Sequence, residues 1–442
     1  MQLKPEPNPL RRRLIAATCA LLSATAARSQ DISATGHDVS DANTDGGKTD
    51  WLFDSALAYY HENGRIQAVE PVVNVSKDYG DGQALGINLT YDALSGSSPN
   101  GALASNKPQT FASPSGKNLT LTSHTYLTNP GQLPVDPHYH DQRLAAGANW
   151  QQPLTRLSQA SFGGKLSYEH DFLSATVDAS IAHDFNQKNT TISFGINDES
   201  DSIHPIGGAP MAGSDYLLFE KTGAKSKNGV GALLGVTQVM TRNWLSEFNL
   251  SVDRFNGYLN DPYKIISVID TFGNTTGYVY ENRPDQRIRR SAYLENRVGW
   301  DRTSGALSLR YMSDDWGIHS ETAQVHLRWW TSDRGQYWEP TLRWYRQTAA
   351  SFYTPWITGA TIPAVGYASS DERLGAFHAL TYGLKYAFKW GDPTDQTGSE
   401  VSFRLEYYQQ IVDNRAPAPT ALQGLDLYPN LQAVLFQIGV SF

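Results

Sequence analysis

The sequence predicts an all-β fold, a transmembrane antiparallel up-and-down β-barrel of about 16 strands, with a range of roughly 14 to 18. Three features of the 442-residue chain favour this fold class. Apolar and polar residues alternate in runs of about ten residues, the length that a tilted strand needs to cross a bilayer core. Long and short connections alternate between these runs. Most tryptophans stand at the ends of the runs, beside the short connections.

Residues 1–27 have the pattern of a cleaved signal peptide. Arg11 to Arg13 precede an apolar stretch over 14–22, and Ala24-Thr25-Ala26 has the A-x-A form of a cleavage site. The lone Cys19 lies inside the apolar stretch, and the residues before it are a poor lipidation motif. The mature chain is therefore expected to contain no cysteine, which excludes a disulfide scaffold and Cys-based zinc sites.

Residues 28–50 are acidic and small, and predict a flexible N-terminal extension before a barrel domain at 51–442. Within the extension, Asp41 to Gly46 matches the first half of an EF-hand calcium loop. The acidic residue required at the twelfth position is absent, because Leu52 stands there, so a solvated tether is favoured over a calcium site. Without its first 30 residues the chain has a net charge of −12, which disfavours nucleic acid as a partner.

From Trp51 onward, apolar and polar residues alternate with the period of two that is typical of strands. These runs are longer than the five or six residues of an average globular strand. The alternation predicts strands at 51–61, 66–77, 84–92, 142–151, 160–170, 173–184, 189–197, 229–240, 244–256, 288–300, 304–312, 321–331, 336–347, 374–390, 399–412 and 430–442.

The C-terminal strand alternates most clearly, and one of its faces is wholly apolar. That face carries Val434, Phe436, Ile438, Val440 and Phe442. A terminal phenylalanine after such alternation resembles the sorting signal that the barrel assembly machinery of Gram-negative bacteria recognises. The resemblance implies location in the cell outer membrane, with outer-membrane lipid and the assembly machinery as partners.

The connections and the tryptophans give the predicted barrel an orientation. The long connections all fall on one rim, at 92–141, 198–228, 257–287, 348–373 and 413–429. Long extracellular loops opposite short periplasmic turns are usual for outer-membrane barrels. An interfacial girdle is expected on the short-turn rim. Its predicted members are Trp51, Trp150, Trp244, Trp300, Trp329, Trp330, Trp338 and Trp390.

Catalytic motifs are scarce. The chain has no GxSxG and no HExxH sequence, and Gly47-Lys48-Thr49 lacks the first glycine of a P-loop. His138, His140 and Asp141, after His124 in the longest loop, are weak candidates for a metal site, and a polar surface loop is favoured. A lipid-hydrolysing barrel would need a Ser–His pair on its outer wall, and the outward positions of the alternation show none. We therefore predict that the protein is not an enzyme and has no cofactor.

The polar face of the predicted strands carries two unlike sets of charge. Before residue 257, the predicted pore-lining charges are Asp54, Glu70, Lys165, Glu169, Asp178, Glu247 and Asp253. After it, they are Glu295, Arg297, Arg310, Arg328, Glu339, Arg343, Lys385, Lys389, Arg404 and Glu406. In an up-and-down barrel the order of strands in the chain is their order in the wall, so an acidic wall should face a basic one. Such charges either line an aqueous pore or form ion-paired ladders that brace a closed barrel.

Four segments carry a family resemblance. They are Leu89 to Ala102, Asp141 to Arg143, Phe162 to Glu169 and Asp184 to Thr191. Over most of the mature chain, the sequence resembles the predicted outer-membrane proteins catalogued as domain of unknown function 3570. The resemblance implies a barrel and implies no activity. The acidic extension departs from the family pattern.

Together these features favour an outer-membrane barrel of porin or channel type that lets small polar or zwitterionic solutes pass. Selection would be electrostatic and steric, without covalent chemistry. The alternative is a non-conducting structural or surface-interaction barrel whose long loops bind a partner. The sequence leaves open which solute or partner is involved, and whether loop 92–141 plugs the lumen.

Overall fold

The computed structural model describes residues 51–114, 125–218, 221–332, 334–359, 366–390 and 399–442. Outside these residues lie the predicted signal peptide and acidic extension, including the Asp41–Gly46 segment, and His124. The predictions made for those parts of the chain stay predictions.

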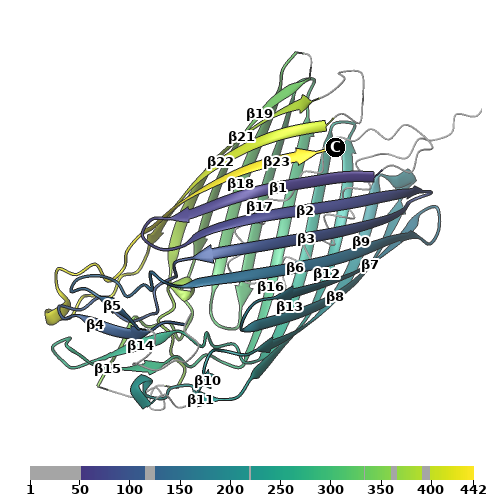
Figure 1. Cartoon of the computed structure of the whole chain (residues 1–442). Coiled ribbons are helices and arrows are strands. Elements are labelled where there is room, and N and C mark those ends of the chain that lie inside the picture. The colour runs from purple at the N-terminus through teal and green to yellow at the C-terminus, as the bar shows by residue number, and fades with distance from the viewer. Residues whose placement is uncertain (1–50, 115–124, 219–220, 333, 360–365, 391–398) are drawn as a thin grey trace, which may run out of the picture.

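Sixteen antiparallel strands close into one barrel (Figure 1). Barrel strands that are consecutive in the chain are neighbours in the wall, and pairing of the first with the last completes the ring. The strands are β1 (Trp51–Glu62), β2 (Gln67–Gly80), β3 (Gln83–Ser95), β6 (His140–Pro153), β7 (Ser158–Tyr168), β8 (Phe172–Phe185), β9 (Thr190–Ile203), β12 (Lys225–Thr241), β13 (Trp244–Gly257), β16 (Gln286–Gly299), β17 (Thr303–Asp314), β18 (His319–Trp330), β19 (Gln336–Gln347), β21 (Phe377–Trp390), β22 (Ser399–Val412) and β23 (Leu431–Ser441). The predicted fold class is confirmed.

All the predicted strands are present, and several extend further toward the long connections than the sequence indicated. Residues 198–203, 225–228 and 286–287, predicted as loop, belong to β9, β12 and β16. On β9 this part is polar on its exposed face, where Asp198 and Ser200 stand. With polar residues on both faces the strand no longer alternates in hydropathy, so the pattern could not reveal it.

The first and last strands close the barrel tightly. The N–H of Phe53 donates to the carbonyl oxygen of Phe442 at 2.8 Å, and the N–H of Phe442 donates back to Phe53 at 2.9 Å. The two rings stack with centroids 5.4 Å apart. Phe436 and Ile438 stand opposite the outward residues Tyr59 and Leu57, so the apolar face of β23 continues the outer face of β1.

Outward side chains of the barrel are largely apolar and exposed. The tryptophans predicted for the girdle all lie near the end of the barrel that carries the short turns, here called the turn end. The prediction is wrong for Trp330, which does not belong to the outer girdle. It occupies an inner position, and the centroid of its ring lies 4.6 Å from that of Tyr337. Neighbouring residues of a strand face opposite sides, so Trp329 and Trp330 cannot both belong to the outer girdle.

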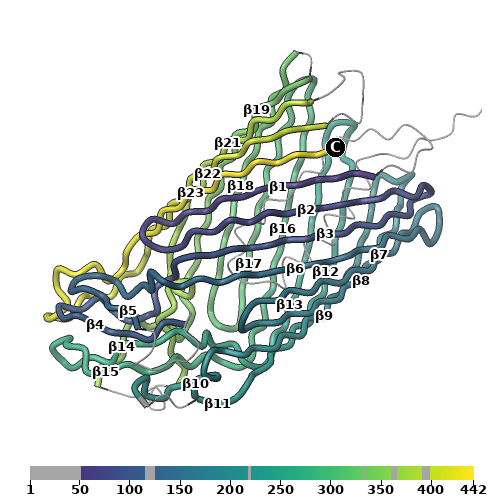
Figure 2. The backbone as a smooth tube through the Cα atoms, viewed as in Figure 1, coloured from purple at the N-terminus to yellow at the C-terminus, as the bar shows by residue number. Residues whose placement is uncertain are grey.

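The long connections gather at the opposite end, here called the loop end (Figures 1 and 2). We call their described residues within 96–139, 204–224, 258–285, 348–376 and 413–430 the cap. Its strands are β4 (Gln109–Ala112), β5 (Thr125–Thr128), β10 (Ala209–Pro210), β11 (Lys221–Thr222), β14 (Ile265–Ile269), β15 (Thr275–Tyr280) and β20 (Trp356–Thr358). β14 pairs with β15 and, in parallel, with β20, which comes from a different connection.

Short 3-10 turns complete the secondary structure. They are η1 (Asn186–Lys188), η2 (Tyr216–Leu218), η3 (Glu372–Leu374) and η4 (Thr420–Leu422). Among the described residues, no helix is long and apolar enough to span a membrane.

Candidate functional site

The strand register places the predicted pore-lining charges on the inner face of the barrel. Inner positions stand opposite inner positions, as Glu247 does with Glu295 and Glu339 with Lys385. The same register gives inner positions to Asp54, Glu70, Lys165, Asp178, Asp253, Arg297, Arg310, Arg328, Arg343, Lys389, Arg404 and Glu406. Glu169 differs slightly, because it lies buried in the turn just after β7.

The same register adds inner charges that sequence reasoning missed. They are Glu62, Asp92, Arg143, Asp184, Glu199, Asp201, Lys227, Arg287, Arg289, Asp314 and Glu400. Many of them stand near the loop end, beyond the apolar belt. Counting in steps of two from Glu295 would have found Arg287 and Arg289. With these additions, the wall from β1 to β13 still carries mainly acids, and the wall from β16 to β22 mainly bases.

Two bases of the acidic wall, Arg143 and Lys227, are paired with acids of the same wall. Arg143 Nη2 lies 3.1 Å from Asp92 Oδ2 and 3.6 Å from Glu70 Oε2. Lys227 Nζ lies 2.7 Å from Asp201 and 3.3 Å from Glu199. The remaining charge of this wall is therefore strongly negative.

Many bases of the basic wall are also paired, which is what the bracing alternative predicted. Arg328 Nε donates to Glu339 Oε2 at 2.7 Å, and Arg404 lies 3.3 Å from Glu406. Other pairs join Lys385 with Glu400 at 3.7 Å, Arg287 with Asp314 at 2.6 Å, and Arg297 with Glu295.

Arg310 and Arg343 differ from these paired residues. Among the described residues, no carboxylate lies within 4.0 Å of either guanidinium. Arg310 stands opposite Tyr293 and Thr322, and Arg343 opposite Gln324. Because an arginine stays charged at any physiological pH, Arg310 and Arg343 present positive charge toward the interior without a described ion-pair partner.

The two walls also differ in bulk. On the acidic wall, side chains lie over inner glycines, and a Cβ added to Gly147 or Gly163 would come within 2.4 Å of Asn88 or 2.3 Å of Asp178. On the basic wall, inner positions carry Tyr293, Tyr345, Tyr408 and other large residues. These large side chains occupy part of the interior beside the basic wall.

A buried ion network holds the cap together. Arg283 lies 2.7 Å from Glu281 and 2.8 Å from Asp371, and Arg373 lies 2.6 Å from Asp371 and 2.9 Å from Asp261. Burial opposes ionisation of Asp371, but the charges of Arg373, Lys264 and Arg283 outweigh it and hold its pKa well below the ordinary value. The network thus joins the connection at 258–285 to the one at 348–376.

The cap is also anchored to the barrel rim. Arg65, in the turn between β1 and β2, donates to Glu372 Oε1 at 2.5 Å. Glu372 follows Asp371, so the anchor and the buried network are adjacent in the chain.

Apolar clusters fill the cap. One cluster joins Phe111, Tyr216, Ile265 and Tyr280, which come from three different connections. Two further clusters join the connections in other combinations and contain Ile266, Val279, Ile357 and Ala368, and Leu103, Ile269, Leu422 and Leu427. Connections that leave distant parts of the rim therefore meet across the loop end, and loop 92–141 contributes its middle to this assembly.

The weak metal candidates do not assemble. The N–H of His138 donates to Asp136, the ring of His140 lies 3.3 Å from the carbonyl of His138, and Tyr139 donates to Asp141. The part of the chain that the structure describes contains no group of three His, Cys, Asp or Glu side chains able to hold a metal.

One Ser–His pair does lie on the outer wall, which corrects the sequence interpretation. Ser158 Oγ lies 2.8 Å from His183 Nδ1, and the two residues are partners across β7 and β8 at the turn end. Thr155 Oγ1 is hydrogen-bonded to Ser158 Oγ at 3.0 Å. Among the described contacts of His183, no carboxylate orients the imidazole, which a catalytic triad requires.

A closed barrel with an apolar outer face and a charged interior defines the class of membrane-spanning β-barrels. Residues 11–442 match the family described as "Protein of unknown function (DUF3570)". The chain belongs to that family, which confirms the resemblance found in the sequence. The match includes residues 28–50, so the expectation that the acidic extension departs from the family pattern was wrong.

Solved structures of outer-membrane barrels are similar in fold. A structure entitled "Bacterial polysaccharide outer membrane secretin" is 10% identical, with 89% of this chain and 98% of that chain covered and a TM-score of 0.41. The protein opdK from Pseudomonas aeruginosa is 9% identical over 89% and 99% of the two chains, with a TM-score of 0.38. OccD3 (OpdP) of the same organism is 9% identical over 90% and 91%, with a TM-score of 0.42. These are similarities of the barrel alone, and no curated protein matches the sequence.

Proposed function

We propose that the protein is a porin-type channel of the Gram-negative outer membrane that lets small polar solutes pass. The observation that carries this proposal is the pair of cations Arg310 and Arg343, which face an acidic wall from inside a closed barrel without carboxylate partners. Ionised groups inside a membrane barrel need water or a partner. A barrel of this strand number is also too wide for side chains alone to fill.

Selection in such a lumen would be electrostatic and steric. Opposed acidic and basic walls create a transverse field, which orients dipolar and zwitterionic solutes and disfavours apolar ones. The Debye length is about 8 Å at physiological salt, so the field is partly screened and selectivity depends on ionic strength.

The cap would limit access to this lumen. Its connections meet across the loop end and share apolar clusters, so a solute must pass between them or wait for them to move. The described residues of this loop that join the clusters, Leu103 and Phe111 among them, would act here as part of a lid at the mouth.

The same cap supports the second candidate function, a non-conducting barrel whose loops bind a partner. A folded surface with its own buried clusters is better suited to specific binding than separate mobile loops, because less ordering entropy is lost on contact. In this reading the charged pairs of the interior brace the barrel.

Planar-bilayer recording of the refolded protein tests the two candidates. In a salt gradient, replacing Arg310 and Arg343 together by Ala should shift the reversal potential toward cation preference. The matched control is Arg346→Ala, which removes an exposed arginine from the outer face of the same strand as Arg343. An unchanged reversal potential would show that the two arginines do not line the conducting path. Folded protein without conductance would favour the partner-binding barrel.

A further inference from the structure

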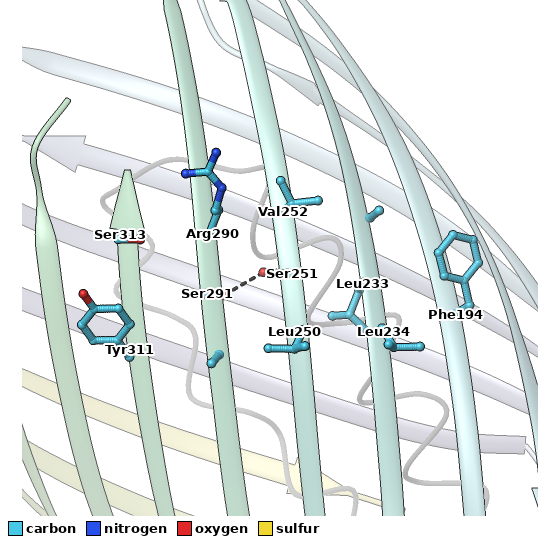
Figure 3. A pocket seen from close by; sticks show the side chains of 12 residues that line it. Phe194, Leu233, Leu234, Leu250, Ser251, Val252, Arg290, Ser291, Tyr311 and Ser313 are labelled. Carbon is cyan, nitrogen blue, oxygen red and sulfur yellow. Dashed lines mark hydrogen bonds between the residues drawn. The ribbon is translucent and has the colours of Figure 1, made fainter. Parts of the chain in front are cut away.

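The outer face of the barrel is recessed over β9, β12, β13, β16 and β17. A groove of about 430 Å³ lies there (Figure 3). Ala232 and Ala292 stand in it where neighbouring outward positions carry Phe194, Leu250 and Tyr311. Because the small side chains leave the wall uncovered, the groove is open to whatever surrounds the barrel.

The groove changes polarity along its length. Figure 3 shows Arg290 and Ser313 at one end of it and Leu234 and Leu250 toward the other. Arg290 stands opposite Ser313 on β17, near the start of β16 at the loop end. The polar end therefore points toward the loop end, and the apolar end toward the middle of the apolar belt.

Arg290 has no anionic partner among the residues that the structure describes. Its side chain is exposed on the outer face, and no described carboxylate lies within 4.0 Å of it. Arg254 stands on β13 one step nearer the loop end, and its guanidinium group reaches only the neutral side chains of Asn256 and Gln286, at 3.4 and 3.2 Å. Diagonal positions on adjacent strands are about 7–8 Å apart, within reach of two long side chains that share a ligand.

The nearest outward acids do not cancel these charges. Asp198 lies at the height of Arg254, but β12 stands between them. Asp315 lies at a diagonal position to Arg290, two residues beyond Ser313, and among the described residues no ion pair within 4.0 Å joins the two side chains. Asp315 instead accepts a hydrogen bond from the backbone N–H of Ile288 at 2.8 Å. The outer wall therefore carries a local excess of positive charge directly above an apolar groove.

We propose that this groove binds a phosphate-bearing glycolipid of the outer leaflet. Guanidinium groups bind phosphate through paired hydrogen bonds, so Arg290 and Arg254 would hold the headgroup phosphate. An acyl chain would lie over Ala232 and Ala292, against Leu250. The inference rests on the proposed placement in an outer membrane, where the headgroups of that leaflet face outward at the height of the two arginines.

Native mass spectrometry of the folded protein in detergent, titrated with bisphosphorylated lipid A, measures this binding. Arg254→Ala combined with Arg290→Ala should weaken it by about tenfold or more, since hydrogen bonds to charged groups are lost. Arg346→Ala is the matched control, because it removes another exposed outer arginine near the loop end, and it should leave binding unchanged. Equal binding by the double variant would overturn the proposal.

A second variant tests the groove independently of charge. Ala292→Phe fills the recess and keeps both arginines, so it should also weaken lipid binding, while heat-modifiable gel mobility reports that the barrel has folded. Lipid A without phosphates should bind weakly. Displacement of the lipid by millimolar inorganic phosphate, or equal binding of phosphatidylglycerol, would overturn the assignment to a glycolipid.

Measuring conductance alongside lipid binding distinguishes failure of the lipid-site proposal from failure of the proposed channel. If lipid binding is insensitive to these variants while the folded protein conducts, the lipid site is wrong and the channel stands. If lipid binding follows the variants in a barrel that does not conduct, the channel is wrong and the lipid site stands.

Discussion

The barrel and the cap bury opposite kinds of side chain. Along the wall, apolar residues such as Leu166 and Val177 face outward, and charges such as Glu247 face the interior. In the cap, Phe111 and Ile265 are buried and form a core of the kind found in soluble proteins. One chain thus follows two burial rules. Along a strand, the point where outward residues change from apolar to polar marks how far the apolar surroundings of the barrel extend.

β9 shows that transition within a single strand. Its outward residues are Phe194 and Ile196 in the apolar belt, followed by Asp198 and Ser200 toward the loop end. The strand continues unchanged through the transition, since its hydrogen bonds to β8 and β12 do not depend on what surrounds it. The backbone ladder is therefore independent of the surroundings, whereas the side-chain pattern depends on them.

The largest effect is expected from a variant that prevents the barrel from closing. Phe442→Asp places a charge where Phe53 and Phe442 stack, and where the first and last strands must pair. An unclosed barrel exposes two strand edges, so the chain should be exported but not inserted. Fractionation and heat-modifiable mobility measure this. Wild-type yield of folded protein in the outer membrane would contradict the predicted role of the terminal strand.

An intermediate effect is expected from breaking the cap. Arg283→Met leaves Glu281 and Asp371 buried without that cation, which should destabilise the cap by about 3–5 kcal/mol. The barrel strands should remain intact, because their pairing does not involve the network. Limited proteolysis would then cut within 96–139 or 258–285 while heat-modifiable mobility persists, and a channel should conduct more.

A surface ion pair provides the control for that variant. Arg302 and Asp301, in a turn at the turn end, are 3.9 Å apart and mostly exposed. Arg302→Ala should change stability by about 0–1 kcal/mol, because water solvates both partners. If Arg283→Met and the Arg302→Ala control both kept the protease resistance of the wild type, the cap would not depend on the buried ion network.

The smallest effect is expected from pH, because the stability of the cap should depend on the protonation of a buried lysine. Burial lowers the pKa of Lys221 to about 8, and its amine donates to the Tyr280 hydroxyl at 2.8 Å. A lowered pKa means that the folded cap disfavours the charged amine, a penalty that is full below pH 8 and is relieved as pH rises toward the unfolded value of 10.5. Burial raises the pKa of Tyr280 above its ordinary value, so that hydroxyl stays neutral over this range.

Resistance of the cap to protease should therefore rise modestly between pH 8 and 10 in the wild type. Lys221→Met should flatten this dependence, because it removes the titrating amine and keeps most of the side-chain volume. A slope that persists in the variant would assign the titration to another group.

The sequence predicted the wall better than the cap for a physical reason. Strand positions and the inner place of Arg310 or Glu406 follow from alternation, which is local and is imposed by unlike surroundings on the two faces. Arg287 and Lys227 were missed because they lie beyond the apolar belt, where both faces are polar. Trp330 was misplaced although it follows Trp329 directly, which already requires opposite faces.

The cap could not be predicted from local pattern. Phe111 packs on Tyr216 and Tyr278, residues of two other connections, and the contact leaves no periodicity in the sequence. The network of Asp261, Arg283 and Asp371 likewise joins distant segments. The unlike charge of the two walls was visible in the sequence, but the distinction between paired Arg328 and unpaired Arg343 required the structure.

The parallel pairing of β14 with β20 determines when the cap can form. β20 belongs to the connection between β19 and β21, so its partner strand must wait until much of the barrel has been made. The cluster that includes Leu103 waits longer still, because Leu422 and Leu427 come just before the final strand. Such long-range contacts form slowly. The cluster that contains Leu103 and Ile269 is thus among the last parts of the cap to be completed, and these two side chains stay without their C-terminal partners until the end of the chain has been made.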